Sequence, residues 1–129
     1  MAIRIVRLGS ARQRGEGLRI GTVRRPPRGV PKAQFASQNW YDVWFPILAP
    51  SDATVKLGLG AATPAQWKAF VRRYRAEMSA AEPGRALDLL AALSRGADFS
   101  VGCYCEDEAR CHRSLLGALL AEKGALLAS

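Results

Sequence analysis

The stretch DFSVGCYCEDEARCHRSLL, residues 98–116, predicts a β-strand that leads directly into a helix. In its first half, larger apolar residues alternate with small or polar ones, which is the two-residue period of a strand. In its second half, leucines begin to recur at the spacing of one helical face, and they continue beyond the stretch: Leu115, Leu116, Leu119 and Leu120. We therefore expect a strand over residues 98–105 and a helix from about 107 to 123.

Other segments show the same two periods. Residues 2–8 and 18–23 alternate as strands, and Thr63 with Gln66 forms a capping box for a helix that begins at Pro64. A further helix is expected over residues 83–95, and residues 41–48 are expected to form a short helix or turn interrupted by Pro46. Strands near both ends with helices between them predict an α/β fold, a single small domain (residues 1–129) with a mixed or parallel sheet flanked by helices.

Composition narrows the class of protein. The chain has 129 residues, 49% of them hydrophobic and 23% charged, which is typical of a globular domain and not of a disordered one. Apolar runs are too short for a transmembrane helix, and the first 25 residues lack the apolar core of a secretory signal, so no membrane partner is expected. Three cysteines confined to residues 103–111 do not make a disulfide framework, and we expect a cytoplasmic location.

The formal net charge of +8 lies entirely in the first quarter of the chain. Residues 1–32 contain one acidic residue, Glu16, and nine basic ones: Arg4, Arg7, Arg12, Arg14, Arg19, Arg24, Arg25, Arg28 and Lys32. Residues 33–129 carry equal numbers of the two signs. Such an excess can attract phosphate backbones without reading bases, or it can form a solvated basic surface. A nucleic-acid-binding module is therefore one alternative function.

The strand-to-helix turn concentrates reactive residue types, and four interpretations of it stay open. His112 and the helix N-terminus could activate Cys105 or Cys111 as a thiolate. Alternatively, His112, Arg113 and backbone amides could bind an anion or a nucleotide. The three acidic residues at 106–108 oppose both interpretations unless basic residues from elsewhere join the site.

The remaining two interpretations are a zinc site and a buried core. Zinc could use four ligands, Cys103, Cys105, Cys111 and His112, but adjacent helical residues point about 100° apart and the spacing is unusual for zinc. The same cysteines and histidine could equally be packed in the interior without any ligand. We assign no metal and no cofactor from the sequence.

Residues 101–116 resemble the C-terminal signature of the DUF488 family, an apolar strand ending in Cys-x-Glu-like residues, followed by Cys-His-Arg and a leucine-rich helix. Four more segments are similar to that family in the same order: the loop Arg24–Val30, the segments Tyr41–Trp44 and Leu48–Ser51, and the helix Trp67–Tyr74. The chain departs from the commoner family form at Val23 and Pro26, where an Asp and a Trp are usual. The resemblance implies a fold and candidate positions, and it implies no reaction.

Together these observations predict a small polar pocket for an anionic or nucleotide-like ligand. Its walls would be the loop 24–29 and the turn 105–113, with the ligand-binding residues Arg24, Arg25, Arg28, Arg113 and Trp44. The sequence leaves open whether the protein is an enzyme. If it is one, His112 is the candidate acid/base, Glu106 the second, and Cys105 or Cys111 the nucleophile. A structural or partner-binding domain without catalysis remains the other alternative, and the oligomeric state is open.

Overall fold

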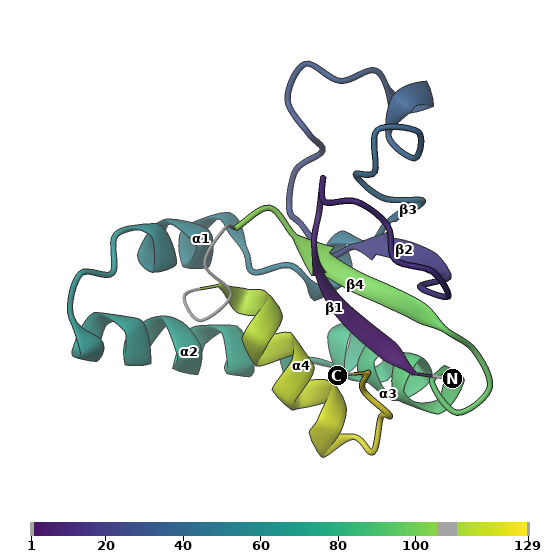
Figure 1. Ribbon diagram of the computed structural model, residues 1–129. Coiled ribbons are helices and arrows are strands. Elements are labelled where there is room, and N and C mark those ends of the chain that lie inside the picture. Colours follow the sequence, from purple (N-terminus) through teal and green to yellow (C-terminus); the bar gives the residue numbers. More distant parts are fainter. Residues whose placement is uncertain (1, 106–110, 129) are drawn as a thin grey trace.

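The computed structural model describes residues 2–105 and 111–128, and it contains a four-stranded sheet in which every neighbouring pair is parallel (Figure 1). The strand order is β1-β4-β2-β3, from β1 (Ile3–Arg7), β4 (Phe99–Cys103), β2 (Leu18–Gly21) and β3 (Val43–Trp44). The described helices are α1 (Asp52–Leu59), α2 (Pro64–Met78), α3 (Ala81–Leu93) and α4 (His112–Glu122). The predicted α/β class with a parallel sheet is confirmed.

Strand β4 is the centre of the sheet. It pairs with β1 from Ile3↔Phe99 onward and with β2 from Leu18↔Phe99 onward, and all five of its residues are buried. Burial on both faces explains why this strand is apolar or small throughout. Since the strands are parallel, β1, β2 and β4 all end at the same edge of the sheet, where open α/β folds place their ligands.

One face of the sheet carries the main core. Figure 1 shows α2, α3 and α4 on this side of the sheet, and their apolar residues pack against alternate residues of the strands. The buried members of this cluster are Ile3, Leu48, Tyr74, Met78, Leu87, Leu90, Phe99, Val101, Leu116 and Leu120. The predicted leucine stripe of the last helix is therefore fully buried at Leu116 and Leu120 and partly buried at Leu115 and Leu119.

The other face is covered by loops and by a buried ion pair. Arg19 and Glu16 have side-chain exposures of 0% and 2%, and their charged groups lie 2.8 Å apart. Arg19 also donates from Nη1 to the carbonyl oxygens of Ser10 and Asn39. Beside it, the ring of Tyr41 lies against Gly21 so closely that a Cβ at position 21 would overlap the ring. This glycine is needed for the close approach of the covering loop.

Several predicted elements differ in extent from the observed ones. The last strand ends at Cys103 instead of Cys105, and α4 begins at His112 with Cys111 as its N-cap. The expected start of this helix falls partly on residues 106–110, which lie outside the described residues. Within residues 41–48, the expected short helix or turn is a 3₁₀ turn, Pro46–Leu48, and the strand β3 precedes it where no strand was expected. The capping box of Thr63 and Gln66 at the start of α2 is confirmed.

Candidate functional site

A cavity of about 720 Å³ opens at the carboxyl edge of the sheet. Three of its walls are the segments that follow parallel strands: residues 7–10 after β1, residues 23–28 after β2 and residues 103–105 at the end of β4. The lining also includes His112, at the start of α4, and Trp40. At and near α1, the cavity is lined by Pro50, Asp52 and Val55. The topology thus brings together chain segments that are about 80 residues apart in sequence.

The loop after β2 places three arginines along this cavity, and each has different surroundings. Arg24 is anchored, because it donates from Nε to the carbonyl of Pro50 at 3.1 Å and from Nη2 to that of Ala49 at 3.0 Å. Arg25 forms an exposed ion pair with Asp52 at 3.2 Å. Arg28 is exposed and stands beside Gly29, whose φ of 75° ends the stiff Pro-Pro segment.

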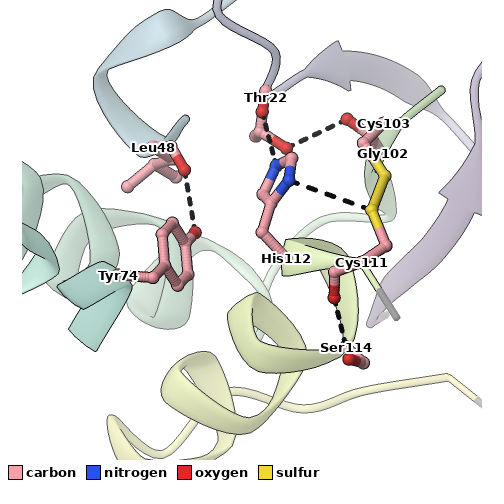
Figure 2. The surroundings of a disulfide bond; sticks show 8 residues. All are labelled: Thr22, Leu48, Tyr74, Gly102, Cys103, Cys111, His112 and Ser114. Atoms are coloured by element: carbon pink, nitrogen blue, oxygen red, sulfur yellow. Dashed lines mark hydrogen bonds between the residues drawn. A yellow bond between two sulfur atoms is a disulfide. The ribbon is translucent and has the colours of Figure 1, made fainter. Parts of the chain in front are cut away.

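Two cysteines and the histidine meet beside this cavity, and Cys103 and His112 line it (Figure 2). Cys103 at the end of β4 and Cys111 at the start of α4 are joined by a disulfide, a pairing that the sequence analysis did not foresee. His112 donates from Nε2 to the carbonyl oxygen of Thr22 at 2.7 Å, and its Nδ1 lies 3.9 Å from the sulfur of Cys111. Thr22 is held in turn by a bond from its Oγ1 to the carbonyl of Gly102 at 2.9 Å.

The imidazole of His112 is neutral at physiological pH. Burial lowers its pKa to about 4, the nearby charge of Arg113 adds to the shift, and the bond to the Thr22 carbonyl opposes it in part. A backbone carbonyl only accepts hydrogen bonds, so Nε2 carries the proton and Nδ1 presents its lone pair toward Cys111. His112 therefore offers the site an electron-pair donor and not a positive charge.

Two aromatic side chains also line the cavity. The rings of Trp40 and Tyr104 pack edge to face with their centroids 5.8 Å apart. Tyr104 donates from its hydroxyl to the carbonyl of Arg25 at 2.9 Å, which ties the end of β4 to the arginine loop. Burial, together with the nearby Tyr41, raises the pKa of Tyr104, so this hydroxyl remains a donor at neutral pH.

The structure distributes the predicted site residues unevenly. Arg24, Arg25, Arg28, Cys105 and His112 line the same cavity. Among the described residues, the lining includes neither Arg113, Trp44 nor Cys111: Arg113 is buried, Cys111 lies behind Cys103 in the disulfide, and Trp44 donates from Nε1 to the carbonyl of Val23 at 2.8 Å. Glu106 lies outside the described residues.

The cavity also includes residues that the sequence analysis did not single out, namely Arg7, Trp40 and Tyr104. Tyr104 carried a signal, because it stands between two cysteines of the signature segment. Trp40 and Arg7 are brought to the cavity only by the tertiary structure.

Comparison with known proteins identifies a family for most of the chain. The profile described as the active DUF488-N3 subclade matches residues 3–124. Searches of curated proteins and of solved structures give no significant match. The matched range includes both the arginine loop and the Cys-His-Arg segment, and it covers nearly the whole chain. The chain therefore belongs to the DUF488 family.

Proposed function

We propose that the cavity binds a small anionic ligand with a planar part, such as a nucleotide. The observation that carries the proposal is the shared cavity of the arginine loop and the Cys103–Cys105 segment, which come from distant parts of the sequence. Its volume, about 720 Å³, lies within the ~300–1,000 Å³ typical of small-molecule sites.

The basic side of the cavity supports an anionic ligand. Arg28 has an exposed side chain, and Arg25 forms an exposed ion pair with Asp52, which contributes little and exchanges easily for a ligand phosphate. Arg24 adds positive charge while its hydrogen bonds hold the loop against residues 49–50. Guanidinium groups bind phosphate or carboxylate in two-point geometry, which favours such groups over halide ions.

The aromatic side of the cavity supports a planar group on the ligand. Trp40 and Tyr104 lie in the wall between the β1 loop and the end of β4, with their rings in contact. A nucleobase stacks on such rings with a gain of about 1–3 kcal/mol. Phosphate at the arginines and a base at Trp40 would use both sides of the cavity.

A chemical step at this site is supported by the description of the matched subclade as active. Of the candidate nucleophiles, Cys105 is the better placed, because it lines the cavity and takes no part in the disulfide. We propose Cys105 as the nucleophile of an enzyme in this family, acting on the bound ligand. His112 lines the same cavity and is the candidate acid/base in this proposal.

The binding proposal is tested by calorimetric titration with adenosine monophosphate and with inorganic phosphate. We expect Arg28→Ala to weaken the binding of both by about tenfold, as loss of one charge-assisted hydrogen bond implies. Trp40→Ala should weaken the nucleotide more than the phosphate. Lys32→Ala removes an exposed charge that does not line the cavity and is the matched control. Equal loss in Arg28→Ala and Lys32→Ala, or no binding of either probe, would refute the proposal.

In the part of the chain that the structure describes, no specific contact favours nucleic-acid binding by the basic N-terminal quarter as a second function. Arg19 is buried against Glu16, and Arg12 pairs with Asp42 at 2.9 Å, so two basic side chains of this quarter are already paired with acidic ones. We also propose a cytoplasmic location, where reducing conditions would convert the disulfide between Cys103 and Cys111 to two thiols. Among the described residues, no helix is long and apolar enough to cross a membrane.

A further inference from the structure

We propose that the reduced protein binds one zinc-like divalent metal ion through Cys103, Cys111 and His112, with a fourth coordination position open to the cavity. This site differs from the four-ligand set considered from the sequence, because Cys105 is not part of it. It concerns the reduced state, since a disulfide between Cys103 and Cys111 occupies both sulfurs.

The three ligand atoms are already gathered. The sulfurs of Cys103 and Cys111 and a ring nitrogen of His112 all lie within 4.8 Å of one another. All three residues are buried, with 1%, 2% and 7% of their surfaces exposed. Two thiolates and one imidazole are a donor set that zinc prefers, and three protein ligands with one open position are typical of catalytic zinc.

The orientation of His112 suits a metal ligand. Its Nε2 proton is donated to the carbonyl of Thr22 at 2.7 Å, which directs Nδ1 to the side where the sulfurs lie (Figure 2). Metal-binding histidines almost always donate their second ring N–H to a carbonyl or carboxylate in this way. Thr22 is itself fixed through Oγ1 to Gly102 on the central strand, so the support for the ring is rigid.

The backbone separation of the cysteines also suits a shared metal. The Cα atoms of Cys103 and Cys111 are 7.8 Å apart, whereas disulfides commonly span about 4.4–6.8 Å. Sulfurs that are each about 2.3 Å from one metal ion stand farther apart than bonded sulfurs, so they need a wider backbone spacing. The end of β4 and the N-cap of α4 provide that spacing.

Electrons, protons and charge all balance in this scheme. Two molecules of a low-molecular-weight thiol reduce the disulfide by two electrons and two protons, and they become one disulfide themselves. Binding of the divalent ion then releases both cysteine thiol protons to solvent. The two thiolates offset the 2+ charge of the ion and the neutral imidazole adds none, so the buried site carries no net charge.

The open position faces the ligand cavity. Cys103 and His112 both line it, together with the arginine loop. A water molecule or an oxygen of a bound anion would complete the tetrahedron. The metal would then act together with the arginines on the same anionic group.

The test measures zinc binding by anaerobic, fully reduced protein, using competition with a chromophoric chelator and metal analysis. We expect one zinc per chain, a loss of affinity of at least tenfold in Cys111→Ser and in His112→Ala, and unchanged affinity in the matched control Cys105→Ser. Cobalt substitution should give the intense visible absorption of a tetrahedral thiolate site.

A second comparison does not depend on any variant folding. Wild-type protein oxidised to the disulfide should bind no zinc, and adding a thiol reductant should restore the binding. Absence of zinc from the reduced protein, or equal loss in Cys105→Ser and Cys111→Ser, would overturn the proposal. Arg28→Ala should leave zinc affinity unchanged, so failure of the anion site and failure of the metal site are separate results.

Discussion

At the scale of single residues, the arginines of the basic N-terminal quarter contribute differently to the stability of the fold. Arg19 is fully buried and bonded to Glu16 and to two backbone carbonyls, so it holds the loops on the sheet. Arg12 instead pairs with Asp42 where both side chains are more than a quarter exposed. A count of arginines gives these two residues equal weight, whereas their contributions to folding differ because of burial.

We expect Arg19→Leu to lower the free energy of unfolding by about 3–5 kcal/mol, because it leaves the buried carboxylate of Glu16 without its partner. Arg12→Leu is the matched control and should cost about 1 kcal/mol or less. Urea denaturation measures both values. Equal losses of unfolding free energy in the two variants would show that burial does not determine how much the Arg19–Glu16 ion pair stabilises the protein.

A second prediction concerns Tyr74, which is fully buried in the main core and donates from its hydroxyl to the carbonyl of Leu48 at 2.8 Å. Tyr74→Phe keeps the ring and removes one buried hydrogen bond, so we expect a loss of about 0.5–1.5 kcal/mol in urea denaturation. Tyr104→Phe removes a more exposed bond to Arg25 and should cost less. The reverse order would contradict this account.

At the scale of elements, α1 depends on a residue of α2. Glu77 accepts hydrogen bonds from the hydroxyls of Ser51 and Thr54 and from the backbone N–H of Ser51, all at the N-terminus of α1. Burial by itself would raise the pKa of Glu77, but these hydrogen bonds and the charge of Arg73 lower it below its usual value. The carboxylate therefore stabilises the helix start in its charged form.

This arrangement predicts a pH dependence of stability. Because the pKa of Glu77 is lower in the folded state, its contribution is complete above the unfolded pKa, near 4.3, and is lost as pH falls through the folded value. Glu77→Gln should therefore be less stable than wild type at pH 7, and the difference should shrink at pH 3. Urea denaturation of wild type and variant at both pH values measures this difference in stability. The control is Glu82→Gln, at the exposed start of α3. If the difference in stability persists at pH 3, the charged carboxylate of Glu77 is not what stabilises the start of α1.

Most elements follow from sequence periods, and the exceptions have physical reasons. Alternation and helical spacing predict β1, β2, β4, α2, α3 and α4, because each has an apolar face of its own. Helix α1 was not foreseen, since its cap partner Glu77 lies 23–26 residues away and Thr54 is its one buried residue. Strand β3 has two residues, both exposed, so no period was visible.

The candidate site was predictable only in part, and for similar reasons. Its two polar motifs are visible in the sequence, and the parallel pairing of β2 with β4 brings them to one edge. Trp40 lines the cavity, whereas Trp44 donates a hydrogen bond to the carbonyl of Val23. Which of the two tryptophans reaches the cavity depends on the conformation of the chain between β2 and β3. The contact between the sulfurs of Cys103 and Cys111 depends likewise on where α4 begins.

At the scale of the whole molecule, the sheet has a protected centre and a weak edge. Strand β4 is paired on both sides and buried throughout, whereas β3 pairs on one side over two exposed residues. Hydrogen exchange at backbone amides follows such differences in local stability.

We expect the amides of β4 to exchange more slowly than those of the other described strands, and the amides at Val43 and Trp44 to exchange fastest among them. Mass spectrometry of peptides from exchanged protein measures this order. Equal protection of β3 and β4 would mean that the edge strand is held by contacts beyond those described.

The position of β4 in the sheet also has a consequence for how the chain is made. β1 and β2 are not neighbours in the sheet, because β4, at residues 99–103, lies between them and pairs with both. A ribosome must therefore synthesise about three-quarters of the chain before β1 can pair with β4, the strand that joins it to β2. Until then β1 has no neighbouring strand of the described sheet, and an exposed strand edge of this kind promotes aggregation of the nascent chain.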